Sequence, residues 1–129
     1  MNYSLSKTVD SSFDEAIKNV VEELKKEGFG VLTEIDVKEI LKKKLDVDFR
    51  KYKILGACNP PFAYEALQAE DKIGLMLPCN VVVQETSEGK IEVSAIDPVA
   101  SMESIDNPQL RDVALKVQAK LKRVIDNLQ

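Results

Sequence analysis

The stretch Ile54–Leu67, ILGACNPPFAYEAL, and the later stretch Leu75–Val83, LMLPCNVVV, contain both cysteines of this 129-residue chain. Each cysteine is followed by an asparagine, in the pairs Cys58-Asn59 and Cys79-Asn80. In both stretches the cysteine lies where an apolar run meets proline. We therefore expect regular elements to end or begin at these two places, and a functional site to form there if the chain has one.

The first stretch predicts a strand that passes directly into a helix. We expect a strand over Tyr52–Cys58 and a short helix over Phe62–Ala69. Asn59-Pro60-Pro61 is typical of a helix start, because asparagine can accept from free amides and proline in the first turn loses no hydrogen bond. In the second stretch, Ile73–Leu77 and Asn80–Glu85 are expected to be strand-like, with a proline break between them.

Toward the N-terminus, Tyr3–Val9 alternates with period two and predicts a first strand. Ser12–Glu15 is a capping box, so a helix is expected to begin there and to close near Gly28. Phe29–Ile35 predicts a second strand. Asp36 can cap a short helix, whose expected apolar face is Val37, Ile40, Leu41 and Leu45. The lysines at 42–44 make either a solvated face or an anion site.

Toward the C-terminus, Thr86–Gly89 predicts a tight turn and Lys90–Ile96 an alternating strand. Residues 99–105 are expected to form an irregular turn or short helix. Asn107-Pro108 then starts a long helix by the same combination of cap and proline. The apolar stripe expected on that helix consists of Leu110, Val113, Ala114, Val117, Leu121, Val124, Ile125 and Leu128.

This order of elements predicts a single α+β domain over residues 1–129, with one antiparallel sheet packed on one face by the first and last helices. The composition is 44% hydrophobic, which is enough for an ordinary core. The net charge of −4 argues against nucleic acid as a partner. No apolar run approaches the roughly 20 residues of a membrane span, and no signal peptide is visible, so we expect a cytoplasmic protein.

Four pieces of sequence occur along the chain: GFGVLTEIDVKEILKKKL (28–45), YKILGACNPPFAYEALQ (52–68), IGLMLPCNVVVQE (73–85) and VSAIDPVASM (93–102). The motifs LGACNP and LPCNV are specific as a pair. In these pieces, and over nearly its whole length, the chain resembles the domain-of-unknown-function family 302 (DUF302). The resemblance implies a fold similar to the TATA-box-binding-protein-like arrangement, β-α-β(4)-α with short extra helices. It implies no activity, because the family has none established.

The two thiols are the first candidates for chemistry. Cys58 ends a strand and precedes a helix start, where amides favour a thiolate. Its strand and that of Cys79 are plausible sheet neighbours, so the thiols could form a redox pair, a persulfide carrier or two ligands of a soft metal. The alternative is that both are small buried hydrophobes.

A polar pocket is a second possibility, formed if Asn59 and Asn80 converge with Cys58 and are walled by Tyr64 and Glu65. Otherwise Asn59 is a helix cap and Asn80 binds backbone at the proline break. Tyr64 would then be a packing residue whose ring is apolar and whose hydroxyl end is polar.

A metal site is a weaker possibility. The chain has no histidine, so such a site would need Cys58, Cys79 and a carboxylate, Asp36 or Asp97. The alternatives are that Asp36 caps a helix and Asp97 is a turn residue before Pro98.

Two functions follow from these residues. The first is a domain that binds a small ligand or acts through a thiol site at Cys58 and Cys79. The second is a non-catalytic interaction module that forms a homodimer, with Tyr3–Val9 or Lys90–Ile96 as an exposed edge strand. An enzyme that uses Cys58 as nucleophile is less favoured, because its only candidate bases are a carboxylate, lysine or tyrosine. No cofactor is indicated.

Overall fold

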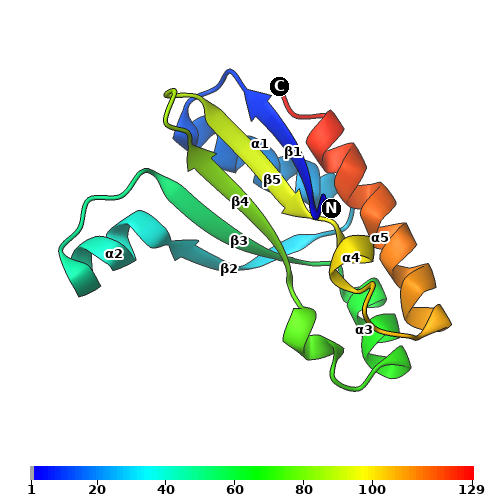
Figure 1. The fold of residues 1–129 in the computed structure, drawn as a ribbon. Coiled ribbons are helices and arrows are strands. Elements are labelled where there is room, and N and C mark those ends of the chain that lie inside the picture. The colour runs from blue at the N-terminus through cyan, green and yellow to red at the C-terminus, as the bar shows by residue number, and fades with distance from the viewer. Residues whose placement is uncertain (1) are drawn as a thin grey trace.

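The computed structural model describes residues 2–129, which form one antiparallel sheet with helices packed on it (Figure 1). The described sheet has five strands in the order β1-β5-β4-β3-β2. The strands are β1 (Ser4–Val9), β2 (Gly30–Asp36), β3 (Tyr52–Cys58), β4 (Cys79–Glu85) and β5 (Ile91–Ile96). The helices are α1 (Phe13–Lys26), α2 (Val37–Leu45), α3 (Pro60–Ala69), the 3₁₀ helix η1 (Ile73–Met76), α4 (Pro98–Ser101) and α5 (Pro108–Asp126). The predicted α+β class and the order β-α-β(4)-α with short extra helices are confirmed.

The core lies between one face of the sheet and the two long helices. In β4, Val81 and Val83 are buried and Val82 between them is only half-buried, as expected when alternate side chains face opposite sides of a sheet. Both α1 and α5 contact β5, and they contact each other, so together they cover the buried face. Their fully buried side chains include Val20, Leu24, Leu121 and Val124.

The two edges of the described sheet are β1 and β2. The prediction that Tyr3–Val9 contains an edge strand is therefore confirmed. The prediction that Lys90–Ile96 could be an edge is wrong, because β5 pairs with β1 on one side and with β4 on the other. The chain returns from α1 to the far edge of the sheet, which leaves β1 free to pair with the last strand.

Polar side chains set the starts of the helices at three of the predicted positions. Ser12, Asp36 and Asn107 each accept a hydrogen bond from the backbone amide three residues further on. Such caps satisfy amides that have no partner within the helix. Among the helices of residues 2–129, none is long and apolar enough to cross a membrane.

The expected strand over Ile73–Leu77 is wrong, because this segment forms η1. β3 ends at Cys58, and its last pairs with the neighbouring strands are Ala57–Cys79 and Cys58–Gly30. Residues before Cys79 therefore have no strand beside them, and their amides bond instead to carbonyl oxygens three residues back.

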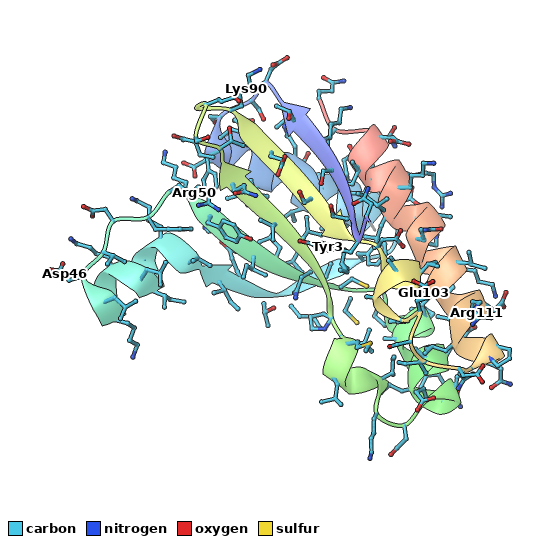
Figure 2. The ribbon with its side chains drawn as sticks, in the orientation of Figure 1. Tyr3, Asp46, Arg50, Lys90, Glu103 and Arg111 are labelled. Carbon is cyan, nitrogen blue, oxygen red and sulfur yellow. The ribbon has the colours of Figure 1, made fainter. Side chains whose placement is uncertain are left out.

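Helix α2 has the expected bounds but not the expected packing. It projects beyond the sheet at the end of β2 (Figure 1), and none of its nine described residues is buried. Its lysines belong to a solvated face, since Lys42 pairs with Asp46 and Asp48, and Lys43 lies 4.0 Å from Glu39. Figure 2 shows Asp46 far out at the end of this helix.

Candidate functional site

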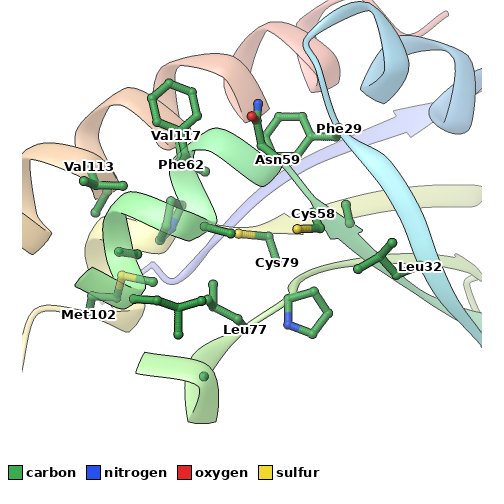
Figure 3. Close-up of a pocket in the computed structure, with 18 residues that line it drawn as sticks. Phe29, Leu32, Cys58, Asn59, Phe62, Leu77, Cys79, Met102, Val113 and Val117 are labelled. Carbon is green, nitrogen blue, oxygen red and sulfur yellow. The ribbon is translucent and has the colours of Figure 1, made fainter. Parts of the chain in front are cut away.

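A cavity of about 320 Å³ opens where β3 ends and β4 begins (Figure 3). Helices α3, α4 and α5 and the start of β2 close around this end of the sheet. The walls are almost entirely apolar, and the side chains that form them include Phe29, Leu32, Phe62, Leu77, Met102 and Val117.

Both cysteines line this cavity. Ala57 is the partner of Cys79 across the β3–β4 ladder, and Cys58 is the next residue of β3. The strands of the two thiols are therefore neighbours, as the sequence led us to expect, and both cysteines are free. Figure 3 shows their side chains at the same wall of the cavity.

The two thiols differ in their surroundings. Cys79 is buried and Cys58 is half-buried. Burial, and to a smaller extent the negative charge of a Cys58 thiolate, together raise the pKa of Cys79 to about 11. Cys79 is therefore protonated near neutral pH and packs as a small hydrophobe, while Cys58 is the thiol that a molecule entering the cavity can reach.

Asn59 lines the cavity but does not have the capping role predicted for it. In the described structure its side chain accepts no capping bond from α3. A cap would accept from the second or third helical amide, and the second belongs to Pro61, which has none. Instead, Asn59 Nδ2 donates to the carbonyl oxygen of Glu27 at 3.1 Å, and the residue is only 8% exposed.

The turn that Asn59 holds joins α1 to β2. Gly28 has a φ of +86° there, and the amides of Gly28 and Phe29 bond to the carbonyl oxygens of Lys25 and Leu24, as in a Schellman motif. A Cβ on Gly28 would lie 3.2 Å from Asn59 Nδ2, so glycine allows both the backbone conformation and the close approach.

Asn80 and Tyr64 do not line this cavity, so the structure does not bring them together with Asn59 and Cys58 there. Asn80 is exposed and is paired with Gly56, on the face of the sheet opposite Cys79. Adjacent residues within a strand point to opposite faces, which is why Asn80 faces away from the cavity that Cys79 lines. Tyr64 is 65% exposed on α3, and the neighbouring Glu65 is exposed as well, because the cavity side of this helix is Phe62, Ala63, Ala66 and Leu67.

The expected metal ligands do not come together. Asp36 is opposite Lys53, at the end of β2 that lies away from Cys58, and it caps α2. Asp97 caps α4 and accepts both bonds from Gln118 Nε2. Among residues 2–129 no three side chains of histidine, cysteine, aspartate or glutamate form a cluster that could hold a metal ion.

Several residues of the cavity were not predicted from the sequence to belong to a site. Val113, Ala114 and Val117 were expected on the apolar stripe of the last helix, and that stripe reaches from the core into the cavity wall. Met102 comes from the segment after the last strand, whose conformation the sequence left open. The available signal was the apolar spacing of Phe62, Ala66 and the α5 stripe, which does not separate a cavity wall from a packed core.

The family of the chain follows from comparison with known proteins. A family model described as "Domain of unknown function DUF302" matches residues 5–128. The crystal structure of an uncharacterized conserved protein DUF302 from Bacillus stearothermophilus is similar over 100% of both chains, with 29% sequence identity and a TM-score of 0.93. No curated protein matches the chain. Together the matched residues and the shared fold show that this chain belongs to the DUF302 family.

Proposed function

We propose that the protein binds a small, largely apolar molecule in the cavity between β3, β4 and α3. The observation that carries this proposal is the cavity itself, about 320 Å³ in volume and lined by apolar side chains with a few polar groups at one wall. Ligand pockets have this character: they are about 300–1,000 Å³ in size, mostly apolar, and carry a small number of placed polar groups.

The size of the cavity supports a ligand over a packing defect. Protein interiors are packed as densely as organic crystals, and voids larger than a water molecule are few. Water gains little in a space with so few hydrogen-bonding partners, whereas an apolar molecule would replace the contacts that the walls lack.

The thiols support a role in contacting the ligand. Cys58 offers a soft, polarisable sulfur and a weak S–H donor at a place that solvent reaches. Cys79 is protonated in the neutral range and adds apolar surface. An electrophilic ligand would therefore react with Cys58 before Cys79. A thiol-dependent function at this site would use Cys58.

Binding can be tested on the native protein with 1-anilinonaphthalene-8-sulfonate, a fluorescent amphiphilic anion whose aromatic rings bind apolar sites. Ala63 lines the cavity, so Ala63→Leu should fill part of it and weaken binding of the probe at least tenfold. Ala119→Leu, on a part of α5 that does not line the cavity, is the matched control and should leave binding unchanged. Equal binding by both variants would place the probe elsewhere and overturn the proposal.

Thiol labelling gives a second readout of the same site. Iodoacetamide should modify Cys58 in the native protein and leave Cys79 unmodified until the chain is unfolded. Bound probe should slow the modification of Cys58. Labelling of Cys58 at the same rate with and without bound probe would separate the thiol from the ligand site.

We also propose that the chain forms a homodimer, as a second function compatible with the first. The observations that favour it are the edge strand β2, whose outer side faces no other strand of the described sheet, and α2, whose described residues are all at least partly exposed. Sedimentation velocity of the native protein tests it: a single species with the mass of one chain, at concentrations up to about 1 mM, would contradict it.

A further inference from the structure

Large exposed apolar side chains gather at the two ends of β2. At its C-terminal end, the arm, which we define as residues 35–47, exposes Ile35, Ile40, Leu45 and Val47. At its N-terminal end, the cavity rim, which we define by Leu32, Leu67, Leu75 and Met76, exposes side chains by 39–86%. Scattered exposed apolar residues need no explanation, but contiguous groups of this kind mark interaction sites.

Helix α2, within the arm, is packed along only part of its apolar face. Isolated helices shorter than about 12–15 residues are marginal in water, and most helices in proteins are stabilised by packing of an apolar face. Helix α2 has nine residues, and Ile40 and Leu45 on its apolar face are 44% and 66% exposed. Helix α2 contacts β3, and Val37 and Leu41 are half-buried, but Ile40 and Leu45 remain uncovered within the chain.

We propose that a second copy of the chain covers the arm, in a two-fold dimer whose β2 strands run antiparallel side by side. β2 is an edge of the sheet, so its outer backbone groups can pair with another strand. Antiparallel pairing sets the C-terminal end of one β2 beside the N-terminal end of the other. Each arm then lies against the cavity rim of its partner, and the contact is made twice, as two-fold symmetry requires.

The charges of the two surfaces favour this arrangement. The arm has four lysines, at 38, 42, 43 and 44, against three acidic residues, Asp36, Glu39 and Asp46. The segment of α3 and η1 that forms the rim carries Glu65, Glu70 and Asp71 against one lysine, Lys72. Contact between arm and rim brings a segment with an excess of lysine beside one with an excess of acidic residues, whereas contact between two arms would set two segments of the same sign side by side.

The dimer would also complete the cavity, a consequence that rests on the ligand site proposed above. Leu32 and Leu67 line the cavity and belong to the rim. A partner helix seated on the rim covers the opening between them and shields a bound apolar molecule from water. The dimer itself does not depend on a ligand, because both surfaces are exposed in the chain alone.

The first experiment measures mass in solution, by light scattering after size exclusion, on the native protein without added ligand. We expect the mass of two chains. Leu45→Asp on the arm and Leu75→Asp on the rim should each give the mass of one chain, because each would bury a charge in the interface. Leu115 is 50% exposed on α5 and lies in neither surface, so Leu115→Asp is the matched control and should remain a dimer.

A second experiment distinguishes arm on rim from other dimers. Chains with Leu45→Cys and chains with Leu75→Cys are mixed, in a background with Cys58→Ala and Cys79→Ala, and oxidised. Each chain then carries a single thiol, so every cross-link joins two chains. Cross-links in the mixture and not in either variant alone support the proposal. Cross-linking of the Leu45→Cys chains with themselves would place arm on arm and overturn it.

The ligand and dimer proposals fail separately. The arm-on-rim dimer would be overturned by a monomeric native protein, or by a dimer that Leu75→Asp and Leu45→Asp do not dissociate. Either result leaves the ligand proposal intact, because that proposal is tested separately by probe binding to Ala63→Leu. A dimer that behaves as proposed while Ala63→Leu binds the probe normally would keep the interface and remove the ligand site.

Discussion

Asn59 Nδ2 donates a hydrogen bond to the carbonyl oxygen of Glu27, and through it the start of α3 is tied to the turn between α1 and β2. The two residues are 32 positions apart in the sequence. The bond is part-buried, and Asn59 itself is only 8% exposed. Asn59 lines the cavity together with Phe29 and Phe62, so the bond helps to fix the cavity wall.

We expect Asn59→Ala to lower the free energy of unfolding by about 1–2 kcal/mol, because the carbonyl oxygen of Glu27 loses its buried donor. Urea denaturation measures the loss. Asn80→Ala is the matched control, since Asn80 is exposed on the open face of the sheet, and it should change stability by less than about 0.5 kcal/mol. Equal effects of the two substitutions would mean that the bond to Glu27 contributes nothing.

Gly56 is expected to tolerate no side chain. A Cβ there would lie 2.1 Å from Thr33 Oγ1 and 2.9 Å from Pro78 Cγ. Gly56→Ala should therefore destabilise the protein by about 1–3 kcal/mol through overpacking. Gly30→Ala, in a neighbouring strand with nothing within 4 Å of the new Cβ, should have a small effect.

The cause of the Gly56 effect can be isolated with a double variant. Thr33→Ala removes the nearer of the two clashing atoms, so Gly56→Ala should cost less in that background than in the native chain. An unchanged cost would show that the clash with Thr33 does not determine the requirement for glycine.

Because the pKa of Cys79 is raised in the folded chain, we expect the protein to lose stability at alkaline pH. This pKa is raised from 9.0 to about 11 in the folded chain. Between these values the unfolded chain releases the proton while the folded chain keeps it, so the unfolded state is favoured as pH rises. The free energy of unfolding should therefore fall by up to about 1.4 kcal/mol per pH unit from this group.

The comparison that isolates this effect is Cys79→Val, which cannot titrate. The difference in stability between the native protein and Cys79→Val should be constant from pH 6 to 8 and should shift toward the variant between pH 9 and 11. Curves that stay parallel through the alkaline range would contradict a raised pKa for Cys79.

Lys7 is expected to stabilise the end of α5. Its side chain lies on the helix-facing side of β1, and its Nζ donates to the carbonyl oxygens of Asp126 at 3.2 Å and Leu128 at 2.5 Å. A cation that bonds the last carbonyls of a helix also interacts favourably with the helix dipole. Lys7→Met should therefore lower the free energy of unfolding by about 1 kcal/mol.

Lys18→Met is the control for this substitution, because Lys18 is exposed on α1. Thermal melts of the two variants should show a lower midpoint only for Lys7→Met. A normal midpoint for Lys7→Met would mean that the end of α5 is held by its apolar contacts alone.

Local chemistry explains why most element boundaries could be predicted. Ser12, Asp36 and Asn107 act on amides only three residues away, so their role is visible in the sequence and is found in the structure. The period of two in β5 and the apolar stripe of α5 likewise reflect which face each element buries, and these predicted the α+β fold.

The prediction failed where a residue's role depends on a distant partner. Asn59 resembles a cap by its position before Pro60, but the carbonyl that it serves comes from the end of α1. The expected strand at Ile73–Leu77 failed for a related reason, because an apolar run becomes a strand only if another strand lies beside it. Asn80 is a different case: it follows Cys79 in β4, and alternation within a strand predicts that the two side chains face opposite sides of the sheet.

By itself, the sequence determined the order of the elements, the ends of most helices and the sheet face that is buried, because these depend on spacing and capping within a few residues. Only the tertiary structure decided that Cys58 and Cys79 share a cavity, that Asp36 and Asp97 lie apart from a common site, and that α2 projects from the sheet with none of its described residues buried. These relationships depend on strand register and on how α3, α4 and α5 meet at one end of the sheet, and no local pattern records contacts between segments so far apart in the chain.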